Sequence, residues 1–218
     1  MQAIKFMKLD LSLLRSWGKF FIIIPIIMLI FAINMQIAFA LNYLFFFLML
    51  ISVTPFSYET VENCQKLFYS LPGKTSDMVM GRYLFLLLSI AALLVFDTVT
   101  ISVLISMDMI SLIDIITVLI SIVVGVLLCL IQYPVYYKYG YQKGKLSSML
   151  IYMIPAFIVF LLPSVISEQG AAASKALQVI EFLSRYPIII AGIIIAIVVL
   201  AAWISYSLSV SICKKKEI

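Results

Sequence analysis

Long apolar runs separated by short polar intervals make up most of the chain. Each run is about 20 residues long, which is the length an α-helix needs to cross the hydrocarbon core of a bilayer. Backbone groups in lipid must hydrogen-bond within their own segment, so the runs are predicted to be helices. The six predicted spans cover about residues 20–38, 41–56, 81–105, 115–133, 149–166 and 187–210, and the basic segment 138–145 is predicted to be the loop between the fourth and fifth spans.

The segment ahead of the first span is basic and amphipathic. Its side chains recur with helical spacing and define two faces. The expected apolar face holds Ile4, Met7, Leu11 and Leu14, and the polar face holds Lys5, Lys8, Ser12, Arg15 and Lys19. We therefore expect an interfacial helix over 1–19, lying on the anionic cytoplasmic leaflet, and a transmembrane domain over 20–218. The alternative is a solvated run of charges.

Two polar intervals between spans also have helical spacing. In the interval after the second span, Tyr58, Val61, Cys64, Phe68 and Leu71 share one face, while Glu59, Glu62 and Lys66 share another. This pattern predicts a short surface helix that ends at Pro72-Gly73, because proline cannot continue the helix. In the interval after the fifth span, the polar face of a second amphipathic helix holds Ser174, Gln178, Glu181 and Arg185. That helix is expected at the outer leaflet, although Glu181 and Arg185 could also be a simple i,i+4 ion pair.

Composition supports a membrane protein and the charges suggest its orientation. The chain is 65% hydrophobic and 11% charged, with a mean hydropathy of +1.20, far from the average of soluble domains. If the N-terminus is cytoplasmic, all 15 basic residues except Lys175 and Arg185 fall on the cytoplasmic side. The positive-inside rule then predicts six spans with both termini in the cytoplasm. Three cysteines and no histidine indicate neither a disulfide framework nor a transition-metal site.

Asp97 is a carboxylate within the third predicted span. An ionised carboxylate in hydrocarbon costs about 3 kcal/mol, so we expect it to face protein, water or a partner. It is a candidate for the substrate path, and the alternative is a protonated or hydrogen-bonded packing residue. Gln36 and Asn42, near the outer end of the first hairpin, are candidates for the same path or for hydrogen bonds between helices.

One short motif suggests ATP binding but lacks the required residues. Gly73-Lys74-Thr75 resembles the end of a phosphate-binding loop, whose first glycine would fall at position 68, which is occupied by Phe68. An intramembrane enzyme would need a paired acid and base or an activated nucleophile, and the chain has no histidine. We therefore expect no catalytic residue, no metal and no cofactor in this chain.

Two motifs carry a family resemblance. The first, over 71–84, has Leu71-Pro72, then Met78-Val79, then Arg82-Tyr83; the second, over 133–145, places Lys138-Tyr139-Gly140 after a proline and an aromatic pair. Both resemble the membrane subunits of type-2 ATP-binding-cassette (ABC) exporters, especially the compact six-span bacterial subset that exports peptides or toxins. Gly73-Lys74-Thr75 departs from that pattern, in which an apolar residue, a small hydroxyl residue and an arginine are usual.

The resemblance implies roles for three groups of residues. Those of a coupling helix that would dock on an ATP-binding subunit are Glu59, Glu62, Lys66, Phe68 and Leu71. Those of a second cytoplasmic loop are Lys138, Tyr139, Gly140 and Lys143. Those of an outer gate are Gln178, Glu181 and Arg185.

The resemblance also implies an assembly. The chain would pair with a second copy or a sister permease and with two ATP-binding subunits, which would hold ATP and magnesium. The expected substrate is an amphipathic peptide or a lipophilic molecule, and the expected location is a bacterial plasma membrane. The alternative function is a membrane immunity or sensor protein that binds a peptide without pumping it.

Overall fold

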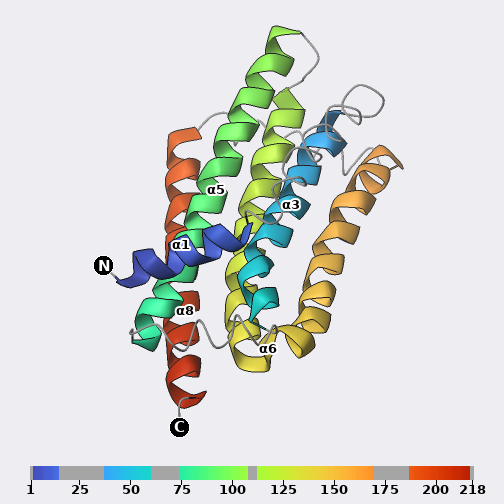
Figure 1. Cartoon of the computed structure of the whole chain (residues 1–218). Helices are drawn as coiled ribbons and strands as arrows, with labels where there is room; N and C mark the ends of the chain where they lie inside the picture. The colour runs from blue at the N-terminus through green and yellow to red at the C-terminus, as the bar shows by residue number, and fades with distance from the viewer. Residues whose placement is uncertain (1, 15–36, 60–73, 108–111, 169–186, 217–218) are drawn as a thin grey trace.

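The structure is a computed structural model and describes residues 2–14, 37–59, 74–107, 112–168 and 187–216. Within these ranges the regular structure is entirely α-helical. The helices are α1 (Gln2–Leu14), α3 (Ile37–Tyr58), α5 (Thr75–Ser106), α6 (Leu112–Glu168) and α8 (Pro187–Lys216). Figure 1 shows the long helices running side by side as a bundle, with α1 lying across α3 and α5.

Three described segments are long and apolar enough to cross a membrane: Thr75–Ser106, Val118–Leu150 and Ala191–Lys215. The third and sixth predicted spans fall in α5 and α8, and the second falls in α3. The fourth and fifth predicted spans both fall in α6. The first predicted span lies almost wholly outside the described residues, so the count of six and the cytoplasmic placement of the termini stay predictions.

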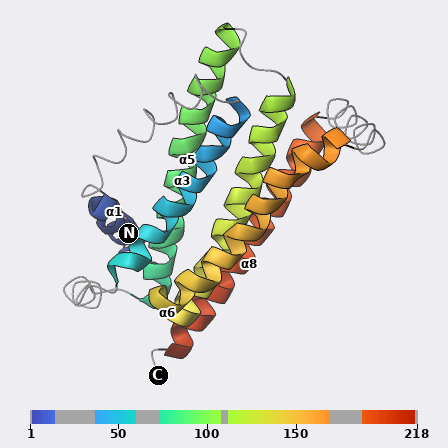
Figure 2. The same cartoon turned by 90° about the vertical axis from the view of Figure 1, so that its right-hand side faces the viewer.

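Helix α6 is two antiparallel helices joined at one residue. Gly140 has φ 73° and ψ 172°, the only non-helical conformation inside α6. Residues with a Cβ rarely adopt these backbone angles, so glycine is suited to the turn. Figure 2 shows the chain reversing direction there. The predicted loop over 138–145 is therefore wrong in extent, because the helix continues on both sides of Gly140.

Helix α1 packs on α5 through Gly81. A Cβ at Gly81 would lie 2.6 Å from Phe6 Cβ and 2.8 Å from the Ala3 carbonyl oxygen, so only glycine allows this approach. The contact decides which face of α1 is buried: Phe6, Asp10 and Leu14 are buried.

The predicted polar face of α1 is exposed where the structure describes it, at Lys5, Lys8 and Ser12. The predicted apolar face is wrong in part. Ile4 and Leu11 are 47% and 43% exposed, because close packing at Gly81 rotates Phe6 and Asp10 toward the bundle.

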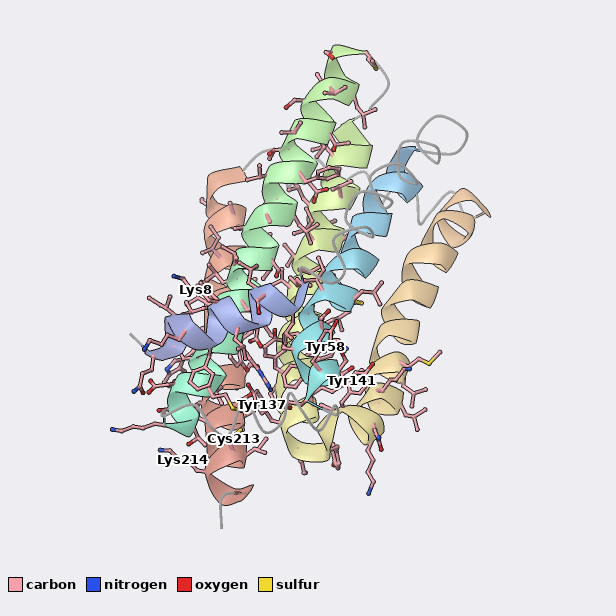
Figure 3. All side chains as sticks on the ribbon, in the orientation of Figure 1. Lys8, Tyr58, Tyr137, Tyr141, Cys213 and Lys214 are labelled. Carbon is pink, nitrogen blue, oxygen red and sulfur yellow. The ribbon has the colours of Figure 1, made fainter. Side chains whose placement is uncertain are left out.

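The main core lies where α3, α5, α6 and α8 meet. Its buried members include Phe56, Val79, Leu86, Cys129, Tyr133, Tyr136, Tyr137 and Cys213. Away from this core, α5 and α8 expose aliphatic side chains such as Val99 and Ile195. Exposed aliphatic surface on long apolar helices is typical of faces that contact lipid. The aromatic part of the core lies toward the end of the bundle that carries Gly140 and the C-terminus (Figure 3).

Candidate functional site

The centre of the candidate site is Arg82, which lies two turns into α5 and is completely buried. Its Nη2 donates a hydrogen bond to Glu59 Oε1 over 2.6 Å. Glu59 directly follows α3, and its side chain is 33% exposed, against 1% for Arg82. A buried guanidinium needs such a partner, because an unpaired charge in the interior costs several kcal/mol. The pair therefore ties the end of α3 to the start of α5.

Aromatic rings surround the same guanidinium. Its Cζ lies 4.5 Å from the Phe56 ring centroid and 5.5 Å from that of Tyr137. Both distances are within the range of cation–π attraction. The Phe56 ring is in turn 5.1 Å from each of the Tyr133, Tyr136 and Tyr137 rings. We call Phe56, Glu59, Arg82, Tyr133 and Tyr137 the Arg82 junction; it joins α3, α5 and α6.

Tyr83 extends the junction to α8 through hydroxyl groups. The Tyr83 hydroxyl lies 2.6 Å from Ser205 Oγ and 2.9 Å from Ser209 Oγ. Ser205 Oγ donates its own proton to the Leu130 carbonyl on α6. Each hydroxyl has one proton to donate, so Tyr83 donates to Ser205 and accepts from Ser209. The chain of hydrogen bonds connects α5, α6 and α8.

The second-loop residues form the turn beside the junction. Lys138, Tyr139 and Lys143 are exposed, and the Lys138 ammonium lies 5.2 Å from the Tyr139 ring centroid. Across the turn, the Tyr136 ring stacks on Tyr141 with centroids 6.1 Å apart. Figure 3 shows Tyr58, Tyr137 and Tyr141 gathered near the end of α3. The two lysine side chains are thus exposed at a turn whose flanking aromatic rings pack on each other.

Asp10 is the unexpected member of this region. Its side chain is only 1% exposed, and neither carboxylate oxygen has a hydrogen-bond partner in the described part of the chain. Burial raises the pKa of the Asp10 carboxyl to about 7, while the charge of Arg82 lowers it and that of Glu59 raises it. Asp10 therefore lies within the electrostatic reach of the Arg82–Glu59 pair.

Asp97 lies about four turns further along α5, roughly 22 Å from Arg82. It is 3% exposed, and its Oδ1 atom has no hydrogen-bond partner among the described residues. The neighbouring hydroxyls do not reach it: Thr98 and Thr100 bond to the carbonyls of Val95 and Phe96 in their own helix. The Asp97 carboxylate was expected to face protein, water or a partner, and the structure buries it. Its place on a substrate path stays a prediction.

The remaining candidate residues lie in α3 or outside the described residues. Asn42 lies in α3, without a described side chain. The candidates outside the described residues are Gln36, Glu62, Lys66, Phe68, Leu71, Gln178, Glu181 and Arg185. Among the residues that the structure describes, no group of three or more His, Cys, Asp or Glu side chains is arranged to hold a metal ion.

Sequence reasoning did not select four residues of the site: Asp10, Phe56, Ser205 and Ser209. A partial signal was present for three of them: Asp10 is a lone acid in a basic helix, and Ser205 and Ser209 are serines four apart on an apolar helix, both of which are unusual. Arg82-Tyr83 and the 133–145 motif were recognised separately, and the structure brings them into contact.

Comparison with known families covers nearly the whole chain. Residues 5–214 match the family model described as ABC-2 family transporter protein. No curated protein and no solved structure matches the chain.

Proposed function

The chain belongs to the ABC-2 transporter family, and on that premise we propose that it is the membrane subunit of an ATP-driven exporter. It would form the transport path together with a second copy or a sister permease. Two ATP-binding subunits would supply the energy and hold ATP and magnesium. The substrate class we propose is an amphipathic peptide or a lipophilic molecule in a bacterial plasma membrane.

The Arg82 junction is the observation that best supports this proposal. Glu59 is the first residue of the segment 59–71, which we propose docks on the ATP-binding subunit. Its carboxylate is bonded to a guanidinium that also contacts Phe56 on α3 and Tyr137 on α6. A displacement of this segment would therefore act on three helices together. Tight packing and buried polar contacts transmit such displacement as a rearrangement rather than absorbing it.

The same geometry separates two roles within the proposed coupling helix. Two thirds of the Glu59 side chain is shielded, and its carboxylate is already used inside the chain. We propose that Glu59 transmits the movement, whereas Glu62 and Lys66 contribute the docking charges. The outward-facing Lys138 and Lys143 provide a second contact on the same side.

Co-expression with a candidate ATP-binding subunit tests the function. We expect the two to co-purify in detergent and to show ATPase activity. Glu62→Lys should abolish co-purification, whereas Glu59→Gln should retain it and uncouple ATP hydrolysis from export in proteoliposomes. The matched control is Asp77→Asn, which removes a carboxylate in the first turn of α5. It should change neither co-purification nor the coupling of ATP hydrolysis to export.

Two results would change the proposal. If no ATP-binding subunit associates with the wild-type chain, the exporter function is wrong, and an immunity or sensor protein that binds a peptide becomes the better explanation. If Glu59→Gln abolishes co-purification as Glu62→Lys does, Glu59 is a docking contact rather than a transmitting one.

A further inference from the structure

Two carboxylates from different parts of the chain lie near one buried guanidinium. Glu59 follows α3 and is bonded to Arg82. Asp10 is on α1, is buried, and has no hydrogen-bond partner within the described residues. A buried carboxylate left in this state is costly, so its retention needs an explanation.

The packing of α1 places Asp10 on the side of α5 that carries Arg82. Phe6 contacts Gly81, which directly precedes Arg82. Asp10 follows Phe6 by one helical turn and is buried on the same face of α1. Leu14, one further turn along, packs with Ile51 of α3 and Phe85 of α5. Asp10 is therefore held between two packed apolar contacts beside the base of α5.

We propose that Asp10 is a second acceptor for Arg82, which turns to it when the Glu59 carboxylate is withdrawn. A guanidinium carries five N–H donors and suits exchange between two carboxylates. While Glu59 is bonded to Arg82, the Asp10 carboxylate has no hydrogen bond. When Glu59 moves away, an ion pair between Asp10 and Arg82 forms and holds α1 against α5. The role of this exchange in transport rests on the proposed function, whereas the exchange itself is a property of the chain alone.

Hydrogen exchange of the full-length chain in detergent tests the proposal without any ATP-binding subunit. The readout is the exchange rate of the amides in residues 5–14, with those of α8 as the internal reference. Glu59→Gln should slow exchange in α1 about tenfold, because a charge-assisted hydrogen bond to Asp10 forms. The double variant Glu59→Gln with Asp10→Asn should lose this slowing, and Asp77→Asn should leave the wild-type rate.

Unchanged or faster exchange of α1 in Glu59→Gln would overturn the proposal, as would an equal slowing in the double variant. Glu59→Asp is a control for a folding defect, since it moves the carboxylate back by one methylene and keeps the charge. It must also slow the exchange of the α1 amides when Asp10 is present. Co-purification is a separate measurement, so this idea and the exporter function fail independently.

Discussion

The two buried charges of α5 are surrounded in opposite ways. Arg82, near the start of the helix, contacts Glu59, Phe56 and Tyr137 from two neighbouring helices and the loop after α3. Asp97, about four turns away, has an Oδ1 atom with no hydrogen-bond partner in the described ranges. A buried charge with several partners stabilises the packing it belongs to, whereas one without them reduces stability. Arg82 therefore ties one end of α5 to neighbouring parts of the chain, whereas the other end buries a carboxylate oxygen for which the described residues supply no partner.

The largest effect on stability is expected when the Arg82 guanidinium is removed. Arg82→Ala should lower the free energy of unfolding by about 3–5 kcal/mol, because it leaves the Glu59 carboxylate without its partner and opens space beside Phe56. Thermal unfolding in detergent measures the effect. Arg82→Lys keeps the charge but loses the planar guanidinium, so its free energy of unfolding should lie between those of the wild-type chain and Arg82→Ala. The exposed neighbour Met80→Ala is the control, and an equal loss there would show that the junction has no special role.

The next effect is a pH dependence of α1. The folded pKa of Asp10, about 7, is above the ordinary value of 3.8 for an aspartate, so the folded state binds the extra proton between these values. Stability is therefore fully present below pH 4 and is lost as the pH rises through 7, by up to about 4 kcal/mol. The charged and titratable groups that act around this site are Arg82 on α5, Glu59 after α3 and Tyr133 on α6.

Exchange of the α1 amides, corrected for the intrinsic rate, measures this dependence. We expect weaker protection at pH 8 than at pH 5 in the wild-type chain. Asp10→Asn should remove the difference, since it leaves no group to titrate at that position. Stronger protection at high pH in the wild-type chain would mean that Arg82 already pairs with Asp10.

A smaller effect is expected where α1 approaches α5. Gly81→Ala places a Cβ within 2.6 Å of Phe6 Cβ and should weaken the docking of α1 by about 1–3 kcal/mol. Gly192→Ala is the matched control, because nothing lies within 4 Å of its added Cβ. It should be neutral or slightly stabilising, since alanine favours a helix over glycine. Equal α1 exchange in the two variants would contradict the close approach.

Much of the helical framework follows from the sequence. Apolar runs of span length lie in α5, in α8 and in both halves of α6, and length with hydrophobicity is enough to predict them. The basic segment 138–145 was predicted to be a loop between the fourth and fifth spans. One glycine with positive φ is sufficient for the reversal, so helix continues on both sides.

The candidate site was predictable only in parts. Arg82-Tyr83 and the 133–145 motif stand out locally, but their contact through Phe56 depends on how three helices pack. The resemblance implied that Glu59 is one of the residues docking on an ATP-binding subunit, and only the structure shows that its carboxylate bonds to Arg82 within the chain. Asp10 was missed because its burial depends on the close approach of α1 to Gly81 of α5. The spacing of residues within α1 gives no information about that approach.

The smallest effect on stability is expected at the other end of the comparison, with the opposite sign. Asp97→Asn removes a buried charge whose Oδ1 has no described partner, so it should raise the free energy of unfolding by about 1 kcal/mol. If Asp97 lies on the substrate path, the same variant should reduce substrate-stimulated ATPase activity of the assembled exporter. Thr98→Val, an exposed neighbour, should change neither quantity. A clear loss of stability in Asp97→Asn would mean that this carboxylate has a partner after all, and the two ends of α5 would then be alike.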